Sequence, residues 1–391
     1  MSGSKSPRDY IADTLVGIPR SGIRDFFDIV STMKDVISLG IGEPDFTTPW
    51  HIREHAIYAL ERGATSYTSN LGLLKLRKAL AAYVEQEFGG VYNPADEILV
   101  AVGVSEALDL AIRAITNPGD EIIYHEPCYV SYRPLITLAH GVPVAIETKG
   151  EHQFRITEAQ LRAAITPKSK AIILNYPNNP TGAALRKEDV EMIARVCAEH
   201  NILVIADEIY AELTYDRPHH SFAAVPGMKD RTIFLHGFSK AWAMTGFRMG
   251  YSCAPPALTD AMMKIHQYSM LCAPILSQEA ALEALTNPAV DIGAMRDSYR
   301  ARRNFLLESF RELDIPCHAP EGAFYVFPEI RKFGLTSKDF AIRLLNEKKV
   351  AAVPGTAFGA CGEGYLRCAY ATSLDQLKVA VKLIGEFIRE I

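Results

Sequence analysis

The chain has few cysteines for its length, and their spacing excludes two classes of protein. Seven cysteines occur among 391 residues, an odd number, and none forms a Cys-x-x-Cys pair. A disulfide scaffold and a zinc ribbon both need paired or closely spaced cysteines. We therefore expect reduced, mostly structural thiols.

Long apolar runs and an excess of basic residues are also missing. No stretch reaches the roughly 20 apolar residues that span a bilayer, and Met1 to Tyr10 lack the apolar core of a secretory signal. Lysine and arginine number 41 against 46 aspartates and glutamates, a net charge of −5. We expect a cytoplasmic protein that binds small molecules, with no nucleic-acid and no membrane partner.

Two cofactor patterns fail as well. Gly40-Ile41-Gly42 is followed by Glu43-Pro44-Asp45, so the third glycine of a dinucleotide fingerprint is absent and a proline stands where its helix would begin. His51-Ile52-Arg53-Glu54-His55 matches a zinc-peptidase pattern. It follows Thr47-Thr48-Pro49, a helix-start signal, and is more typical of the polar face of a surface helix. We expect no metal.

The residues that are present favour a large α/β protein. With 48% hydrophobic residues the chain can bury a sizeable core and exceeds one ordinary domain. Short β-branched runs alternate with amphipathic stretches, the pattern of α/β layering. Strands are expected at Glu97–Val102, Glu121–His125, Ala171–Asn175, Leu203–Ala206, Thr232–His236 and Gly250–Cys253. Helices are expected at Ser105–Thr116 and Val190–His200.

The last third of the chain has a different pattern. A long charged helix is expected at Arg296–Leu313, a strand at Gly322–Pro328, and helices at Ser337–Glu347 and Leu374–Ile391. This indicates a smaller α+β domain, which the N-terminal segment joins through Leu39. The expected division is residues 1–44 for the N-terminal segment, 45–286 for the large domain and 287–391 for the small domain.

Lys240 is the candidate nucleophile. It stands in Gly237-Phe238-Ser239-Lys240, directly after the apolar run Thr232 to His236, with Arg248 eight residues further on. A lysine placed where a buried strand ends can act as an amine nucleophile, although most lysines are solvated surface charges. Its neighbours raise that prospect. Four earlier apolar runs also end in polar residues suited to a phosphorylated aromatic ring, and such a ring bound to lysine as an imine is pyridoxal phosphate.

Three of those runs end in residues with both a functional and an ordinary interpretation. Gly103-Val104-Ser105 would offer helix N-terminal amides and a hydroxyl to a phosphate, or would hold a simple serine cap. Tyr129 could stack on a ring or pack in the core. The turn from Asn175 to Gly182 presents an amide at a fixed place, but such turns also form for conformational reasons alone. Because ligands bind beyond the carboxyl ends of strands in open α/β sheets, the functional interpretation is worth testing at each.

Asp207 carries the sharpest physical argument after Lys240. It follows Leu203-Val204-Ile205-Ala206, where a carboxylate is costly to bury unless it is paired. A pyridinium nitrogen would be such a partner, and holding it protonated makes the ring an electron sink. The alternative is that Asp207 caps a helix starting at Glu208. Tyr210, three residues later, could bond the phenolate oxygen of the ring.

Together these residues are similar to the class I and II aminotransferases, which are fold-type I pyridoxal-phosphate enzymes, from about Ser21 to the C-terminus. The matching motifs, in chain order, are Leu39–Phe46, Asn178–Gly182, Asp207–Tyr210, Ser239-Lys240 with Arg248, and Leu366–Ser373. The resemblance implies an α/β fold whose large domain has a mostly parallel mixed sheet between helices, plus a smaller α+β domain. It also implies pyridoxal 5'-phosphate as cofactor, an amino acid and a 2-oxo acid as substrates, and a homodimer with shared active sites.

The resemblance further implies a role for each matched residue. Lys240 would form the internal aldimine and carry the proton, Asp207 would pair with the ring nitrogen, and Tyr129 would stack on the ring. Asn179 and Tyr210 would bind the ring oxygen. The phosphate would be held by Val104, Ser105, the neighbourhood of Ser239, Arg248 and, from the other subunit, Tyr67. One phosphate hydroxyl of many relatives is absent, because Gly237 takes the place of a serine.

On the substrate side, the resemblance places the α-carboxylate against Arg367, Asn179 and the backbone at Gly42, with Ile18 in the side-chain pocket. Aspartate-specific relatives bind the distal carboxylate through an arginine of the partner subunit, and the corresponding stretch, His266–Pro274, has none. This favours aromatic, long apolar or acylated diamino acid donors and looks like the aromatic and N-acetyl-diaminopimelate aminotransferases. An aspartate aminotransferase, or a β-lyase on the same fold, is the alternative.

Overall fold

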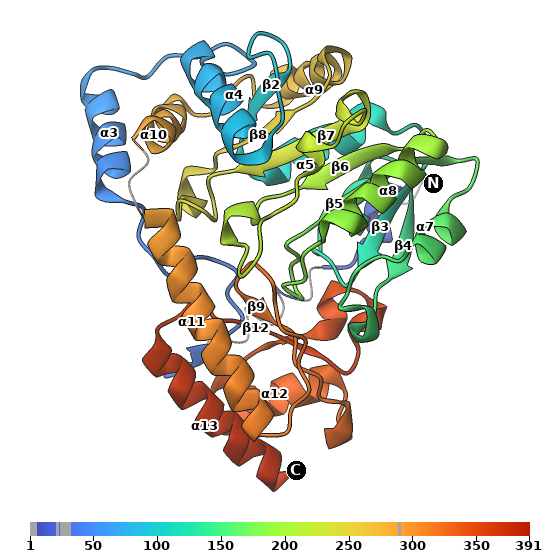
Figure 1. The fold of residues 1–391 in the computed structure, drawn as a ribbon, viewed down its shortest axis with the longest axis vertical. Coiled ribbons are helices and arrows are strands. Elements are labelled where there is room, and N and C mark those ends of the chain that lie inside the picture. Colours follow the sequence, from blue (N-terminus) through green and yellow to red (C-terminus); the bar gives the residue numbers. More distant parts are fainter. Residues whose placement is uncertain (1–5, 21–22, 24–32, 288–290) are drawn as a thin grey trace.

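The computed structural model describes residues 6–20, 23, 33–287 and 291–391. Its main feature is a seven-stranded sheet in the upper half of Figure 1. In sheet order the strands are β2 (Ile98–Ala101), β8 (Gly250–Cys253), β7 (Thr232–Gly237), β6 (Leu203–Asp207), β5 (Ser169–Asn175), β3 (Glu121–Glu126) and β4 (Val142–Glu147). Only β8 runs against its neighbours in this sheet, so the sheet is mixed but mostly parallel.

Helices cover both faces of the large sheet. Their bounds are α3 (Trp50–Glu61), α4 (Leu74–Phe88), α5 (Gly103–Ile115), α6 (Tyr132–Leu138), α7 (Glu158–Ala164), α8 (Lys187–Glu199), α9 (Pro256–Ser269) and α10 (Ile275–Thr286). Along β5, Ala171 and Ile173 enter the core under α5, α6 and α9, whereas Ile172 and Leu174 enter the core under α8. Because side chains alternate between the faces of a strand, a run that is apolar throughout needs cover on both sides.

A smaller α+β region lies below the large sheet in Figure 1. It contains α11 (Asp291–Glu312), α12 (Ser337–Lys348), α13 (Leu374–Glu390), β1 (Ile37–Ser38), β9 (Tyr325–Val326), β10 (Val350–Ala351), β11 (Val353–Pro354) and β12 (Leu366–Ala369). β1 pairs in parallel with β10, and Leu39 is fully buried in the core of this region. The N-terminal segment thus contributes a strand here, while the exact domain limits stay a prediction.

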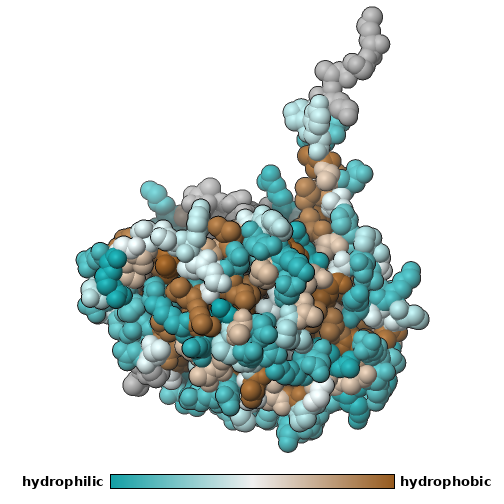
Figure 2. Space-filling view, turned by 90° about the horizontal axis from the view of Figure 1, so that it is seen from above, coloured by the Kyte–Doolittle hydropathy of each residue, from teal (hydrophilic) through white to brown (hydrophobic). Residues whose placement is uncertain are grey.

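Short elements complete the chain. The helix α1 (Asp13–Val16) packs against α6, and the arm that carries it, residues 6–20, projects from the body in Figure 2. The 3-10 helices are η1 (Pro7–Tyr10), η2 (Gly150–His152), η3 (Ala211–Leu213), η4 (Phe222–Ala224), η5 (Lys229–Arg231), η6 (Thr245–Phe247), η7 (Arg331–Phe333), η8 (Gly355–Phe358) and η9 (Ala360–Gly362). None of the helices in these ranges is long and apolar enough to cross a membrane.

Several elements differ from the sequence-based expectation. The strand β4 was not expected: its run Val142 to Ile146 is apolar but contains Pro143, and only Ile146 is buried. The strand expected at Gly322–Pro328 is only two residues long, and Gly322 and Pro328 form isolated bridges to Thr214 and Cys317 instead. The helix expected from Ser105 begins two residues earlier, at Gly103.

Candidate active site

Lys240 lies just beyond the end of β7, and its amine reaches across to the N-terminal segment. The Nζ atom donates a hydrogen bond to the carbonyl oxygen of Gly42 at 2.7 Å. Burial lowers the pKa of Lys240 to about 8, an effect that the charge of nearby Glu43 opposes. A lowered pKa increases the fraction of free amine near neutral pH, which is the form that attacks a carbonyl group.

Asp207 ends β6 and is 5% exposed. Its Oδ2 atom accepts a hydrogen bond from the Tyr132 hydroxyl at 2.8 Å, and its Oδ1 atom accepts one from the Ile209 backbone at 3.4 Å. Burial raises the pKa of Asp207 to about 6, although the Tyr132 bond opposes the shift. At pH 7 the carboxylate is therefore mostly ionised but poorly solvated, which fits a cationic ring nitrogen as its partner.

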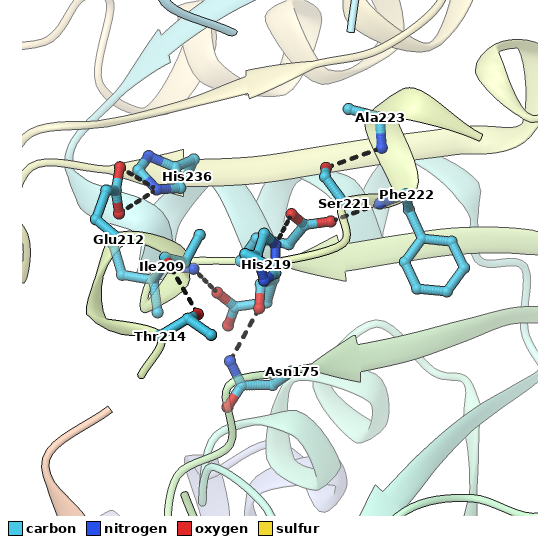
Figure 3. A network of polar contacts seen from close by, with 12 residues as sticks. Asn175, Ile209, Glu212, Thr214, His219, Ser221, Phe222, Ala223 and His236 are labelled. Atoms are coloured by element: carbon cyan, nitrogen blue, oxygen red, sulfur yellow. Dashed lines mark hydrogen bonds and ion pairs between the residues drawn. The ribbon is translucent and has the colours of Figure 1, made fainter. Parts of the chain in front are cut away.

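The alternative in which Asp207 caps a helix beginning at Glu208 is wrong. The Glu208 backbone N–H donates to the Leu235 carbonyl at 3.0 Å, and helical turns begin only at Ala211. The Glu208 side chain is also occupied: its carboxylate lies 2.6 Å from His219 Nε2 and accepts from the Phe222 backbone N–H at 2.9 Å. Figure 3 labels these two partners, His219 and Phe222. The two neighbouring acidic residues thus differ in role: Asp207 stands at the carboxyl end of β6, whereas Glu208 fixes the loop of His219 and Phe222.

Sequence reasoning missed Tyr132, which belongs to the first turn of α6 and is fully buried. Its ring meets the half-buried ring of Tyr129 edge to face at 5.7 Å. The two tyrosines face the same region because a turn joins them, in which the Tyr132 backbone N–H donates to the Tyr129 carbonyl at 3.2 Å. The link from Tyr132 to Asp207 joins residues 75 positions apart, so nothing in the local sequence points to it.

Arg367, on β12, is 2% exposed and reaches the same region from the small α+β part. Its Nη1 atom donates to Asn179 Oδ1 at 3.0 Å, and its Nη2 atom donates to the Gly40 carbonyl. Its Nε atom is buried and has no hydrogen-bond partner among the described residues. Burial lowers the pKa of this guanidinium, yet arginine stays charged in proteins. A buried cation with an unused donor suits a carboxylate ligand.

Tyr210 and Gly42 complete this part of the site. The Tyr210 hydroxyl lies 2.9 Å from the Tyr325 hydroxyl, and the Tyr325 ring lies under the Arg367 guanidinium at 4.7 Å. A Cβ atom on Gly42 would stand 2.8 Å from the Tyr325 hydroxyl. The backbone at Gly42 can come this close to Lys240 and Arg367 because the residue has no side chain.

An anion cradle forms where α5 begins. Gly103 has a φ of +78°, and a Cβ atom there would lie 2.7 Å from Arg248 Nη2. A Cβ atom on Gly250 would lie 2.5 Å from the Val104 backbone nitrogen. Two glycines therefore let the guanidinium of Arg248 approach the helix N-terminus, where the exposed Ser105 follows. Backbone N–H groups and a guanidinium at one place suit a phosphate group.

The glycine at position 237 also has a steric reason. A Cβ atom there would stand 2.8 Å from the Met249 carbonyl oxygen and 2.9 Å from a Val104 methyl carbon. A serine would force the neighbouring backbone to move. Ser239, two residues later, is 8% exposed and stands next to Lys240.

Two predicted site residues, Tyr67 and Ile18, stand apart from Lys240. Tyr67 is 82% exposed, and Ile18 is partly buried just after α1. Within the described ranges, no hydrogen bond, ion pair or ring contact joins either of them to Lys240. Asn70 does donate to the Leu271 carbonyl at 2.7 Å, so the Tyr67 segment lies beside the stretch that lacks a distal arginine.

The two histidines of the zinc-peptidase pattern, His51 and His55, lie on α3. His55 faces two glutamates of α10, Glu279 at 3.7 Å and Glu283 at 3.5 Å. No group of three potential metal ligands occurs among the residues that the structure describes. These contacts give His55 an ordinary role between two helices.

A sequence model of the family described as aminotransferase class I and II matches residues 34–384. The chain belongs to this family. Class I and II aminotransferases depend on pyridoxal phosphate, and the fold and the enzyme class expected from the sequence are confirmed. The Lys240 amine with its lowered pKa, the buried carboxylate of Asp207 and the anion cradle at α5 fit this cofactor.

The aminotransferase relatives carry different names. The chain is 51% identical to the putative aminotransferase YugH of Bacillus subtilis (strain 168), over 97% of this chain and 99% of that protein. It is 43% identical to an aspartate aminotransferase of Pyrococcus abyssi (97% and 98% covered) and 42% identical to a probable N-acetyl-LL-diaminopimelate aminotransferase of Bacillus subtilis (94% and 93%). The solved structure of an aromatic aminotransferase from Pyrococcus horikoshii OT3 is 42% identical, with a TM-score of 0.90 over 94% of this chain and 99% of that one.

Proposed function

We propose that this aminotransferase moves the amino group of an aromatic, long apolar or acylated diamino L-amino acid to a 2-oxo acid such as 2-oxoglutarate, by a ping-pong reaction. One observation carries the proposal. The Lys240 amine donates a hydrogen bond to the Gly42 carbonyl, and Gly42 also lies beside the buried Arg367 guanidinium. A nucleophilic amine and a carboxylate-binding cation thus share one small space.

Each residue has a physical task in this reaction. Pyridoxal phosphate, when bound, supplies the aldehyde that takes up the amino group and the ring that withdraws electrons. Arg367 binds the substrate α-carboxylate through two parallel N–H groups, which fixes the Cα–H bond relative to Lys240. Lys240 then moves the proton at the substrate Cα, for which a pKa of about 8 is well matched to neutral pH.

Asp207 and Tyr210 have electrostatic tasks. The Asp207 carboxylate would keep the ring nitrogen protonated, and the Tyr132 hydroxyl keeps the carboxylate oriented. Asn179 and Tyr210 would hold the ring oxygen, and Tyr129 would contact the ring. The residues at the start of α5, Arg248 and Ser239 would bind the phosphate.

The choice of donor depends on the pocket rather than on Arg367, since every amino acid has an α-carboxylate. Three relatives named for different substrates are 42% or 43% identical to this chain. Sequence identity therefore does not indicate which amino donor this protein uses. The stretch His266–Pro274 has no arginine, and Tyr268 and Met270 within it are 88% and 53% exposed. An apolar, uncharged pocket wall disfavours a second carboxylate. An aspartate aminotransferase remains the second candidate, because a 43% identical relative bears that name.

A screen of amino donors against 2-oxoglutarate, ranked by kcat/KM, tests this proposal. We expect aromatic, long apolar or N-acylated diamino acids to lead. Aspartate leading by tenfold or more, about 1.4 kcal/mol, contradicts the donor class. Ammonia released without any 2-oxo acid acceptor indicates a β-lyase instead. As a control, Arg367→Lys should lower kcat/KM for all donors by a similar factor.

We also propose a homodimer with shared active sites, located in the cytoplasm. The support is that Tyr67, Tyr268, Met270 and Leu271 are all exposed, and that the Asn70–Leu271 hydrogen bond places the segment of Tyr67 beside that of the other three. Exposed aromatic residues of this number on one surface favour a protein interface. In such a dimer, Tyr67 contacts the phosphate of the partner subunit, which accounts for its exposure in the single chain.

A further inference from the structure

Asn175 is buried between two residues that the proposed function assigns to the cofactor ring. It is the last residue of β5, is 1% exposed and stands opposite Asp207 of β6 in the sheet register. The loop that follows it carries Asn179. Figure 3 shows the Asn175 amide directed from β5 toward the end of β6. The residue therefore stands where the Asp207 strand and the Asn179 loop meet.

Both ends of the Asn175 amide are used. Its Nδ2 atom donates to the backbone carbonyl of Asp207 at 2.9 Å, and its Oδ1 atom accepts from the backbone N–H of Asn179 at 3.1 Å. One planar group thus connects the main chain of the ring-nitrogen residue to the main chain of the ring-oxygen residue. Because the amide is rigid, it fixes the spacing of the two peptides.

The Asn175 backbone is itself held from a third strand. Its N–H donates to His125 Nε2 at 3.3 Å, and His125, the last but one residue of β3, has its ring stacked on Tyr176 at 4.6 Å. Burial lowers the pKa of His125 to about 4, so the neutral ring accepts this bond at neutral pH. Asn175 is therefore fixed before it fixes its neighbours.

An amide side chain fits position 175 because it offers both a donor and an acceptor. The carbonyl of Asp207 needs a donor and the N–H of Asn179 needs an acceptor, and both lie in a buried place where an unmet group is costly. Aspartate at this position would set an oxygen against the Asp207 carbonyl. Alanine would leave both groups unmet.

We propose that Asn175 is a positioning residue for the transamination site, setting the distance between the Asp207 carboxylate and the Asn179 amide. The inference rests on the proposed function, in which these two residues hold opposite sides of the cofactor ring. It concerns affinity for the cofactor and the electronic state of the ring rather than substrate choice.

Asn178 supplies a matched control in the same loop. It is also 1% exposed, but its side chain bonds only within the loop: its Oδ1 accepts from the Thr181 N–H at 3.1 Å and from the Thr181 hydroxyl at 2.7 Å, and its Nδ2 donates to the Asn179 carbonyl at 3.3 Å. It has no hydrogen bond to Asp207 among the described residues. Loss of either asparagine destabilises the loop, and only Asn175 links the loop to Asp207.

The test compares Asn175→Ala, the isosteric Asn175→Asp and Asn178→Ala in the full-length dimer-forming protein. The measurements are the pyridoxal phosphate dissociation constant, the pH midpoint of the visible absorption of the holoenzyme, and the Tm without cofactor. We expect both Asn175 variants to bind the cofactor about tenfold or more weakly. Their pH midpoint should rise, because without the bond to the Asp207 carbonyl Asn179 is no longer held at its distance from Asp207 and donates less well to the ring oxygen.

Asn178→Ala should lower Tm while changing affinity and midpoint little. The inference is overturned if both Asn175 variants bind like wild type, or if Asn178→Ala weakens binding equally, which would indicate loop stability alone. Should Asn175→Ala fail to fold, Asn175→Asp decides, since it keeps the shape and the Asn179 contact. If the wild-type protein binds no pyridoxal phosphate, the proposed function fails instead, which separates the two outcomes.

Discussion

The proposed ring-binding side and the proposed phosphate-binding side of the site are built in different ways. On the ring side, Asn179, Asp207 and Tyr210 are 7%, 5% and 4% exposed. On the phosphate side, Ser105 and Arg248 are exposed, and Tyr67 is 82% exposed. The residues proposed to bind the ring are buried within a single chain, whereas Ser105, Arg248 and Tyr67 are open to solvent.

This difference reflects what each side must bind. A ring nitrogen and a ring oxygen need few, well-oriented partners in a dry place, so their residues are fixed by Tyr132, Asn175 and Tyr325. A phosphate dianion is large and strongly hydrated, so its donors gather at an accessible helix N-terminus. The ring side should therefore respond to substitution through chemistry, and the phosphate side through affinity and through the partner subunit.

The largest effect is expected for Lys240→Ala, which removes the nucleophile between the two sides. Proton transfer by a positioned group contributes about 10²–10⁴-fold to a rate, so kcat should fall at least that far. The wild-type holoenzyme should show a pH-dependent visible band that borohydride bleaches, and the variant should lose it. An unchanged band in Lys240→Ala would contradict the assignment. Lys264→Ala, a surface substitution on α9, serves as the control.

Asp207→Asn is expected to lower kcat by about 10²-fold or more, while it stabilises the cofactor-free protein at neutral pH. The folded pKa of about 6 exceeds the ordinary 3.8, so the folded chain holds the proton more tightly than the unfolded chain. In the wild-type protein, the stability contributed by the protonated Asp207 carboxyl is fully present below pH 4 and is lost as the pH rises through 6. At neutral pH the ionised, buried carboxylate therefore lowers the free energy of unfolding by up to about 3 kcal/mol.

Because asparagine cannot ionise, the variant avoids this cost. Its Tm should exceed that of wild type at pH 7.5 and match it near pH 4, as measured by calorimetry without cofactor. A lower Tm at both pH values would show that the carboxylate is not strained by burial. The exposed pair Asp260 and Lys264 offers Asp260→Asn as a neutral control.

The smallest effect is expected for a substitution of Tyr67, on the proposed phosphate-binding side. In the proposed dimer, Tyr67→Phe removes one charge-assisted hydrogen bond to the phosphate of the partner subunit, which should weaken cofactor binding by about tenfold. At a cofactor concentration that leaves Tyr67→Phe mostly empty and inactive, mixing it with Lys240→Ala should restore activity, because hybrid dimers contain one site with both native residues. Each variant alone, taken through the same mixing, is the control. A fully active monomer in the ultracentrifuge would refute the shared site.

Several parts of the site could be predicted from the sequence because the signal is local. Asp207 and Lys240 follow apolar runs, and the carboxyl ends of parallel strands meet at one edge of the sheet. The strands β3 and β8 were located to within a residue, because short runs with buried apolar residues such as Ile122, Ile123 and Tyr251 mark them. The edge strand β4 also has an apolar run, but Pro143 within it disfavours a strand and most of its residues are not fully buried.

What the sequence by itself determined, then, was the set of chemically reactive residues and the α/β order of the elements that carry them. Tertiary structure alone decided which side chains support them. Tyr132 meets Asp207 across 75 positions, and Tyr325 meets Tyr210 across 115. Such pairs form because sheet order and the docking of the small α+β region bring distant chain segments together. A hydrogen bond of this range leaves no periodic pattern in the sequence, so only the folded chain reveals it.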